Sequence, residues 1–354
     1  MTIIGKLTLL LVFGLASSCS VSDERVESST SPLSANDSIS SESVSSNLTD
    51  ALEVLSDSNI SSTSTSLTLQ DSATTRPTTT KTKSCSVAGD NAIVSINSSI
   101  EGNIEFSNSR KDVSRSITGS GTVNRTWSKT DATVLCNENE KHAAINWSAD
   151  DIAGLTLSVS IDRSRETEST ITRLSDNESS SRVKKTSVSG TRTVSWSSHT
   201  DNNDGTFTRV KSVSSSVTRS KTITSSVDAS ISLSMTVATE ENAPLQITVV
   251  RNSTSRALIS KKISSGTLRT SENESSHVLT DFQDYTLAFT DSSCVPSSGK
   301  LTASFYESGT EGAVKILELS VSDGSYTLND ITDPENPSEI NDFDYDLCDI
   351  NSFN

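Results

Sequence analysis

The clearest pattern along the chain is an alternation of two side-chain chemistries between Phe207 and Val237. Almost every even position in this stretch is Ser or Thr, while the odd positions are mainly apolar, with Lys and Arg among them. A period of two places the two sets on opposite faces of an extended chain. The stretch therefore predicts β-structure with one hydroxyl face and one face that is apolar and basic.

The length of this stretch predicts that it is interrupted. Fully extended it would reach about 100 Å, whereas strands of compact domains are usually shorter than about ten residues. We expect the chain to turn near residues 214–216 and again near residues 225–228. Because the alternation keeps its parity throughout, either the turns contain an odd number of residues or the stretch is one long, curved pair of strands.

Shorter segments with the same period flank this stretch, among them residues 155–161 and 245–249. Residues 201–205 are a strong turn signal, so residues 191–197 should form an antiparallel hairpin with the chain from Phe207. No segment has a sustained helical period. The pattern predicts an all-β fold of about ten to fourteen antiparallel strands, arranged as a β-sandwich or as a long-stranded curved sheet.

Composition divides the chain into regions. Ser and Thr supply about a third of all residues, far above ordinary usage. Residues 20–84 are Ser/Thr-rich, acidic and poor in apolar side chains, which predicts a disordered tether. Residues 85–354 form the predicted β-rich ectodomain, either undivided or with a subdomain boundary near residue 200, and they end in an acidic tail.

The first nineteen residues have the features of an export signal. Lys6 precedes an apolar run from Leu7 to Leu15, which is too short to span a membrane as a helix. The run ends in Ala16-Ser17-Ser18-Cys19, which resembles the lipobox of bacterial lipoproteins, although Ala16 stands where that motif most often has Leu. The resemblance implies lipidation of Cys19 and anchoring in the bacterial cell envelope, at the outer membrane by analogy with Ser20. Cleavage by an ordinary signal peptidase is the alternative.

The charge is unevenly distributed along the chain. The net charge is −16, yet residues 110–270 carry 22 Lys and Arg against 16 Asp and Glu. Cations on the apolar and basic face are candidates for binding an anionic ligand such as a glycan, phosphate or lipid: Arg192, Arg209, Lys211, Arg219 and Lys221. Alternatively, they solvate exposed strands and block aggregation. Nucleic-acid binding is disfavoured because only Phe207 and Trp196 lie near them as aromatic platforms.

Four cysteines follow Cys19, and an even number in an exported chain predicts two disulfides. Among the three connectivities we favour the local one, Cys85 with Cys136 and Cys294 with Cys348. The chain has no C-x-x-C sequence, and its three histidines are scattered, the nearest to a cysteine being His142, six residues after Cys136. We therefore expect neither a zinc site nor thiol-redox chemistry.

The chain contains no catalytic motif that we recognise, and we expect neither enzymatic activity nor a cofactor. Residues 342–346 begin like a calcium loop, but Leu347 and Phe353 occupy the positions where that loop needs Gly and Glu. A solvated acidic tail is the better interpretation. We therefore predict a membrane-anchored lipoprotein with a non-enzymatic binding or structural ectodomain that takes a glycan, lipid or protein ligand at the cell surface.

Two alternative functions follow from the same sequence. Residues 223–237 resemble the amphipathic, Ser/Thr-rich hairpins of aerolysin-type pore-forming proteins, and this resemblance implies a hairpin that inserts into membranes. The other alternative is a cell-envelope hydrolase whose active site has no recognisable motif.

Overall fold

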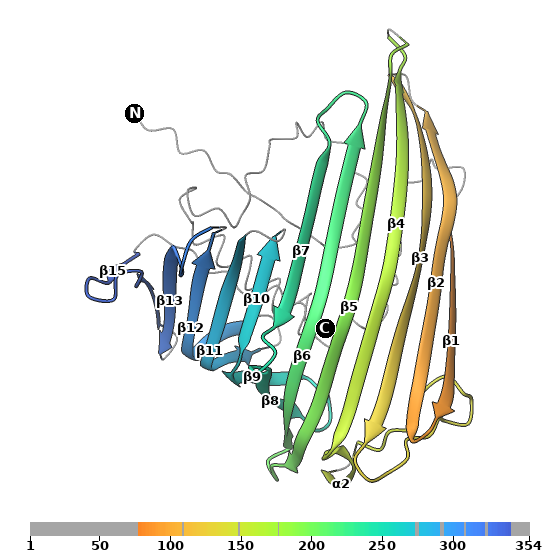
Figure 1. Ribbon diagram of the computed structural model, residues 1–354. Helices are drawn as coiled ribbons and strands as arrows, with labels where there is room; N and C mark the ends of the chain where they lie inside the picture. The colour runs from red at the N-terminus through yellow and green to blue at the C-terminus, as the bar shows by residue number, and fades with distance from the viewer. Residues whose placement is uncertain are drawn as a thin grey trace.

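The computed structural model describes residues 77–107, 110–147, 149–175, 177–272, 276–290, 294–307, 309–322 and 325–340. Within these ranges the chain forms fifteen strands in one antiparallel sheet and a single helix of four residues (Figure 1). The all-β prediction is confirmed. Of the two architectures predicted, the structure has the long-stranded curved sheet and not the β-sandwich. The predicted signal peptide, Cys19, nearly all of the tether and the acidic tail lie outside the described residues.

The elements follow one another along the chain as β1 (Thr78–Ala88), β2 (Asn91–Ser107), β3 (Lys111–Lys129), α2 (Ala149–Ile152), β4 (Leu155–Arg173), β5 (Ser179–Asp201), β6 (Thr206–Ser225), β7 (Ile231–Thr239), β8 (Leu245–Asn252), β9 (Leu258–Ser265), β10 (Thr267–Glu272), β11 (Ser276–Phe289), β12 (Cys294–Tyr306), β13 (Lys315–Ser322), β14 (Ser325–Asp330) and β15 (Ser338–Glu339).

Strands β1 to β6 form a meander in which each strand pairs with the next one in the chain. β5 alone has 23 residues, which corresponds to roughly 75 Å at the usual rise per residue. The hairpin expected between residues 191–197 and the chain from Phe207 is confirmed as β5 and β6. β1 begins at Thr78 and not near Cys85, because the hydroxyl-rich residues 78–84 pair with β2, an interaction that composition alone does not reveal.

The predicted alternation gives the sheet two chemically different sides. We call the side that carries the odd-numbered residues of β6 the basic side, and the opposite one the hydroxyl side. Residues directly paired across antiparallel strands point to the same side. The register therefore extends both sides across the meander, from β1 to β7.

A bend crosses the sheet beyond β6. β8 pairs with residues 206–213 of β6 and β7 with residues 216–223, so β7 and β8 are two halves of one interrupted strand. β9 and β10 are likewise interrupted at Gly266, and the pairing of β11 is irregular between Gln283 and Thr286. The predicted turn at residues 214–216 is wrong, because β6 continues there and its partner strand breaks instead. The break expected near residues 225–228 is confirmed, and five residues, 226–230, separate β6 from β7.

Two glycines allow the bend. Gly266 and Gly299 have φ values of +122° and +105°, where side chains are rarely tolerated. A Cβ atom at Gly299 would lie 2.3 Å from the carbonyl oxygen of Asp284, so the two strands approach too closely for any other residue. The larger apolar core lies at the bend and includes Ile247, Ile263 and Tyr285.

A smaller core lies where the 130–147 connection covers one end of β1 to β4. Cys85, Val94 and Val159 are buried there together with Val134 of the connection. The Cys85–Cys136 disulfide joins β1 to this connection, which confirms the first predicted pair. Cys294 is the first residue of β12, but Cys348 lies outside the described residues, so the second pair stays a prediction.

Candidate anion-binding face

The two sides of the meander differ in the sign of their charges. Among the described residues of β1 to β7, only Asp201, beyond a bulge at the end of β5, places a carboxylate on the basic side. The hydroxyl side holds the other carboxylates of these strands together with rows of Ser and Thr: Glu101, Glu105, Asp112, Asp162, Glu166 and Glu168. The basic side is therefore strongly cationic although the whole chain is acidic.

Seven of the cations on the basic side lie on four adjacent strands, β3 to β6, in the half that is nearer the β6–β7 turn. We call them the cation cluster: Arg115, Arg163, Arg165, Arg182, Lys184, Arg219 and Lys221. They come from four adjacent strands, and the register sets their spacing, since Arg165 and Lys221 both pair with Thr186 of β5. Apolar residues such as Ile117 and Ile223 are buried between them.

The members of the cluster repel one another. Burial lowers the pKa of Lys184 below its ordinary value, and four neighbouring cations lower it further: Lys221, Arg165, Arg182 and Arg115. Burial and the charge of Arg115 also lower the pKa of Arg165. An anion placed among these groups would relieve the repulsion, which is the electrostatic property of an anion-binding surface.

The arginine stems lie flat along the sheet. A Cβ atom at Gly121 would lie 2.3 Å from Cγ of Arg163, so this glycine leaves the room in which the Arg163 side chain crosses to the next strand. The Nε atoms of Arg163 and Arg165 are buried and have no hydrogen-bond partner among the described residues. These two guanidinium groups, on alternate residues of β4, therefore have no internal acceptor on Nε.

The five cations singled out from the sequence lie on the same side but not at one site. Arg192 and Lys211 are only 2% and 5% exposed, so they belong to the interior. Arg219 and Lys221 belong to the cation cluster. Arg209 lies at the opposite end of β6, where it contacts aromatic rings.

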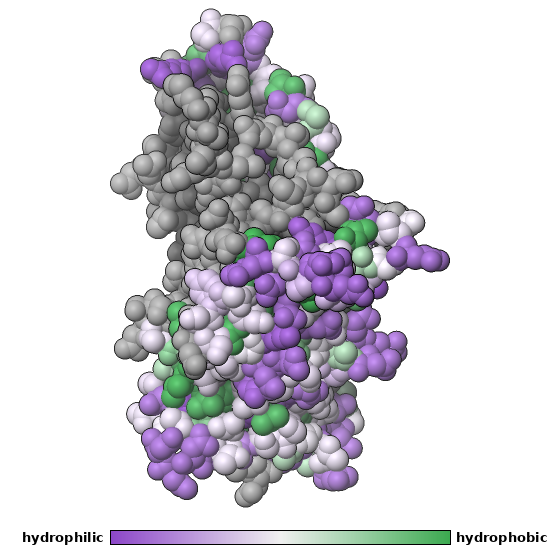
Figure 2. Space-filling view, turned by 90° about the vertical axis from the view of Figure 1, so that its left-hand side faces the viewer, coloured by the Kyte–Doolittle hydropathy of each residue, from purple (hydrophilic) through white to green (hydrophobic). Residues whose placement is uncertain are grey.

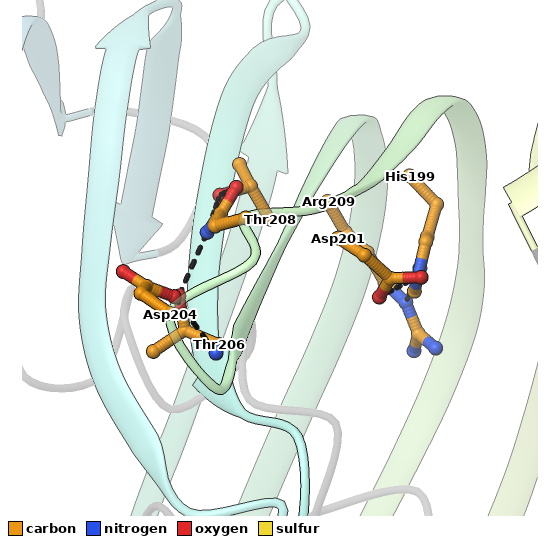
Figure 3. A network of polar contacts seen from close by, with 7 residues as sticks. His199, Asp201, Asp204, Thr206, Thr208 and Arg209 are labelled. Carbon is orange, nitrogen blue, oxygen red and sulfur yellow. Dashed lines mark hydrogen bonds and ion pairs between the residues drawn. The ribbon is translucent and has the colours of Figure 1, made fainter.

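Arg209 is the centre of an aromatic cluster that fastens the 130–147 connection to the sheet. Its guanidinium carbon lies 4.8 Å from the ring centroid of Trp147 and 4.7 Å from that of Phe207. Its Nε donates a hydrogen bond of 3.0 Å to Nδ1 of His199, whose Nε2 lies 3.3 Å from Asp201 (Figure 3). Trp147 also contacts both other tryptophans of the chain, Trp127 and Trp196.

The adjoining β5–β6 turn is held by its own polar contacts. Asp204 accepts hydrogen bonds from the backbone N–H and the hydroxyl of Thr206, at 2.9 and 2.6 Å (Figure 3). These bonds lower the pKa of Asp204, because they stabilise the carboxylate. Phe207 and Trp196 are 2% and 7% exposed. Neither ring is therefore accessible as a stacking platform for a nucleic-acid base.

The sequence-based search missed five members of the cation cluster: Arg115, Arg163, Arg165, Arg182 and Lys184. The signal that could have found them lies in residues 162–168, where acidic residues occupy even positions and both arginines occupy odd ones. In a strand this parity separates the two signs onto opposite sides.

The described part of the chain contains no group of three or more His, Cys, Asp or Glu residues able to hold a metal ion. None of its helices is long and apolar enough to cross a membrane. Hydrophilic and near-neutral residues cover most of the described surface in the view of Figure 2, with apolar residues scattered among them. Comparisons with protein-family models, curated proteins and solved structures found no match.

Proposed function

We propose that the protein is an exported, lipid-anchored binding module that captures an anionic glycan on the basic side of its sheet, without enzymatic activity. The observation that carries the proposal is the cation cluster, seven cations on four adjacent strands with no carboxylate from β1 to β7 on that half of the side. If these charges served only to keep the strands solvated, a mixture of both signs would stabilise the sheet more, because opposite charges pair across strands.

An extended sheet suits a polymer better than a small ion. The cluster spans β3 to β6, and neighbouring strands lie about 4.8 Å apart, so the cations form a band on the order of 15 Å wide. Repeated sulfate, phosphate or carboxylate groups along a glycan can reach several of these cations at once. Such binding weakens as salt increases, because both surfaces release bound counterions.

Binding to dextran sulfate, with neutral dextran as the reference polymer, tests this function. Lys184→Gln should weaken the binding by about threefold to tenfold, because one cation near a polyanion contributes roughly 1 kcal/mol. Lys185→Gln is the matched control: Lys185 is the next residue, yet it lies on the hydroxyl side, where its Nζ is 3.2 Å from Glu166. Equal effects of the two substitutions, or equal affinity for both polymers, would contradict the proposal.

The anchor is a separate part of the proposal. The Cys85–Cys136 disulfide supports export, since such bonds persist in oxidising compartments. Replacing Cys19 with Ala should move the protein from the membrane fraction to the soluble fraction of bacterial cells, as measured by fractionation and immunoblotting. Wild-type protein gives the reference distribution, and continued membrane association of the variant would refute anchoring through Cys19.

Membrane insertion is the second candidate, and the β6–β7 hairpin favours it. Ile231, Leu233 and Met235 alternate with serine and threonine along β7, as a lipid-facing strand requires. However, Arg219 and Lys221 of β6 lie on the same side, and each would add about 2–4 kcal/mol at the bilayer midplane. We therefore place this function below glycan binding. Dye release from liposomes measures it directly.

A further inference from the structure

The hydroxyl side of the meander contains a groove. Its volume is about 560 Å³, and it crosses the strands from β2 to β6. This size lies within the range of ligand-binding pockets, which is roughly 300–1,000 Å³. The groove lies behind the cation cluster, on the opposite surface of the same strands.

A row of serines runs along the groove. Ser99, Ser120, Ser164, Ser187 and Ser220 pair directly with one another in sequence order, one from each of five adjacent strands. All five line the groove. The row therefore presents one hydroxyl group per strand, spaced by about 4.8 Å.

The hydroxyls at the two ends of this row are paired, while the central ones are not. Ser99 bonds to Thr80 at 2.6 Å, and Ser220 bonds to Ser234 at 3.2 Å. The side chains of Ser120, Ser164 and Ser187 are exposed, and their hydroxyls have no hydrogen-bond partner within the ranges that the structure describes. Three neighbouring hydroxyls at the middle of the groove are thus available both to donate and to accept.

Carboxylates determine which ligands the groove can accept. Glu101 and Glu166 lie on the next row and also line the groove. Of the two cations in the lining, only Lys185 points to this side, since the Arg165 side chain belongs to the cation cluster, so Lys185 offsets only one of the two negative charges. The groove is therefore unfavourable for a polyanion. A neutral ligand rich in hydroxyl groups could instead donate to the carboxylates and exchange hydrogen bonds with the serines.

We propose that this groove binds an extended, neutral, β-1,4-linked polysaccharide that lies across the strands. Such a chain is nearly straight, and one sugar is about as long as the spacing of roughly 4.8 Å between neighbouring strands, so successive sugars can meet successive serines. Because adjacent sugars are turned by about half a rotation, the same sugar edge meets every second serine. An α-1,4-linked glucan coils and cannot keep this register. The site goes beyond the function proposed for the basic side and does not depend on it.

Isothermal titration of the folded ectodomain with cellohexaose, chitohexaose and maltohexaose tests the site. We expect at least one of the two β-1,4-linked oligosaccharides to bind and maltohexaose not to bind. The double substitution of Ser164→Val and Ser187→Val should weaken binding by about tenfold or more, because two neutral hydrogen bonds are lost. Valine favours strands, so folding should be kept.

Ser158→Val is the matched control, since Ser158 lies on the same strand and the same side as Ser164 but outside the groove. It should leave the affinity unchanged, and thermal melting should show that both variants fold. Failure of both β-linked probes to bind, equal binding of maltohexaose, or an equal loss in the control would overturn the proposal. Binding of dextran sulfate is measured in parallel, and it should be unaffected by the serine substitutions, so that a failure of either site is recognised separately.

Discussion

At the scale of single residues, the position of a charge in the alternation determines its role. Arg163 and Arg165 directly adjoin Asp162 and Glu166 in the sequence, yet the strand places the two signs on opposite sides of the sheet. Neighbours in sequence therefore do not neutralise one another locally. The sheet therefore carries a cationic surface on one side and an acidic, hydroxyl-rich surface on the other.

Arg209 illustrates a cation whose role is structural. Arg209→Ala should lower the free energy of unfolding by about 2 kcal/mol, because it removes a hydrogen bond to His199 and two cation–π contacts. Denaturant unfolding followed by tryptophan fluorescence measures this loss, and the change at Trp147 provides a local signal.

The control for this prediction is Arg173→Ala. The side chain of Arg173 is 65% exposed, and its ion pair with Glu178 is long, at 4.0 Å. We expect its removal to change stability by less than about 0.5 kcal/mol. If the two variants were equally stable, the aromatic cluster would contribute nothing measurable.

At the scale of elements, the bend depends on backbone contacts that few residues permit. Gly299→Ala should lower the free energy of unfolding by about 3 kcal/mol or more, since the added Cβ would lie 2.3 Å from the Asp284 carbonyl oxygen. Gly312→Ala is the control, because Gly312 has a similar φ of +91° but nothing within 4 Å of its Cβ position. It should cost about 1 kcal/mol, as judged by thermal and denaturant unfolding. Similar losses in both variants would mean that φ alone, and not the close approach, matters.

The elements also show what can be predicted from sequence. The alternation predicts strands β5 and β6, their hairpin and their two faces, because period and turn residues are local properties. It does not reveal that β6 continues through residues 214–216, since the break falls in the partner strand. It also leaves residues 78–84 in the tether, because their pairing with β2 is a nonlocal contact.

At the scale of the whole molecule, the five cations predicted from the sequence only partly match the cation cluster that the structure shows. All five cations named from the sequence lie on the basic side, but the burial of Arg192 and Lys211 depends on how the sheet bends over its core. The cation cluster needs the register of β3 with β4 and of β4 with β5, which places Arg115 near Lys184. Register follows from the whole meander and not from any single segment.

The Cys85–Cys136 disulfide determines how the molecule would respond to tension. A pull on the N-terminal end reaches β1 first, and β1 would peel from β2 starting at the Thr78–Glu101 pair. Peeling stops at Cys85, because the covalent bond there passes the load directly to Cys136, 51 residues later in the chain. Strands β2 and β3 lie inside the covalent loop and are shielded from the force. A protein held at its N-terminus would thus yield by a short, reversible extension before the cation cluster on β3 to β6 was disturbed.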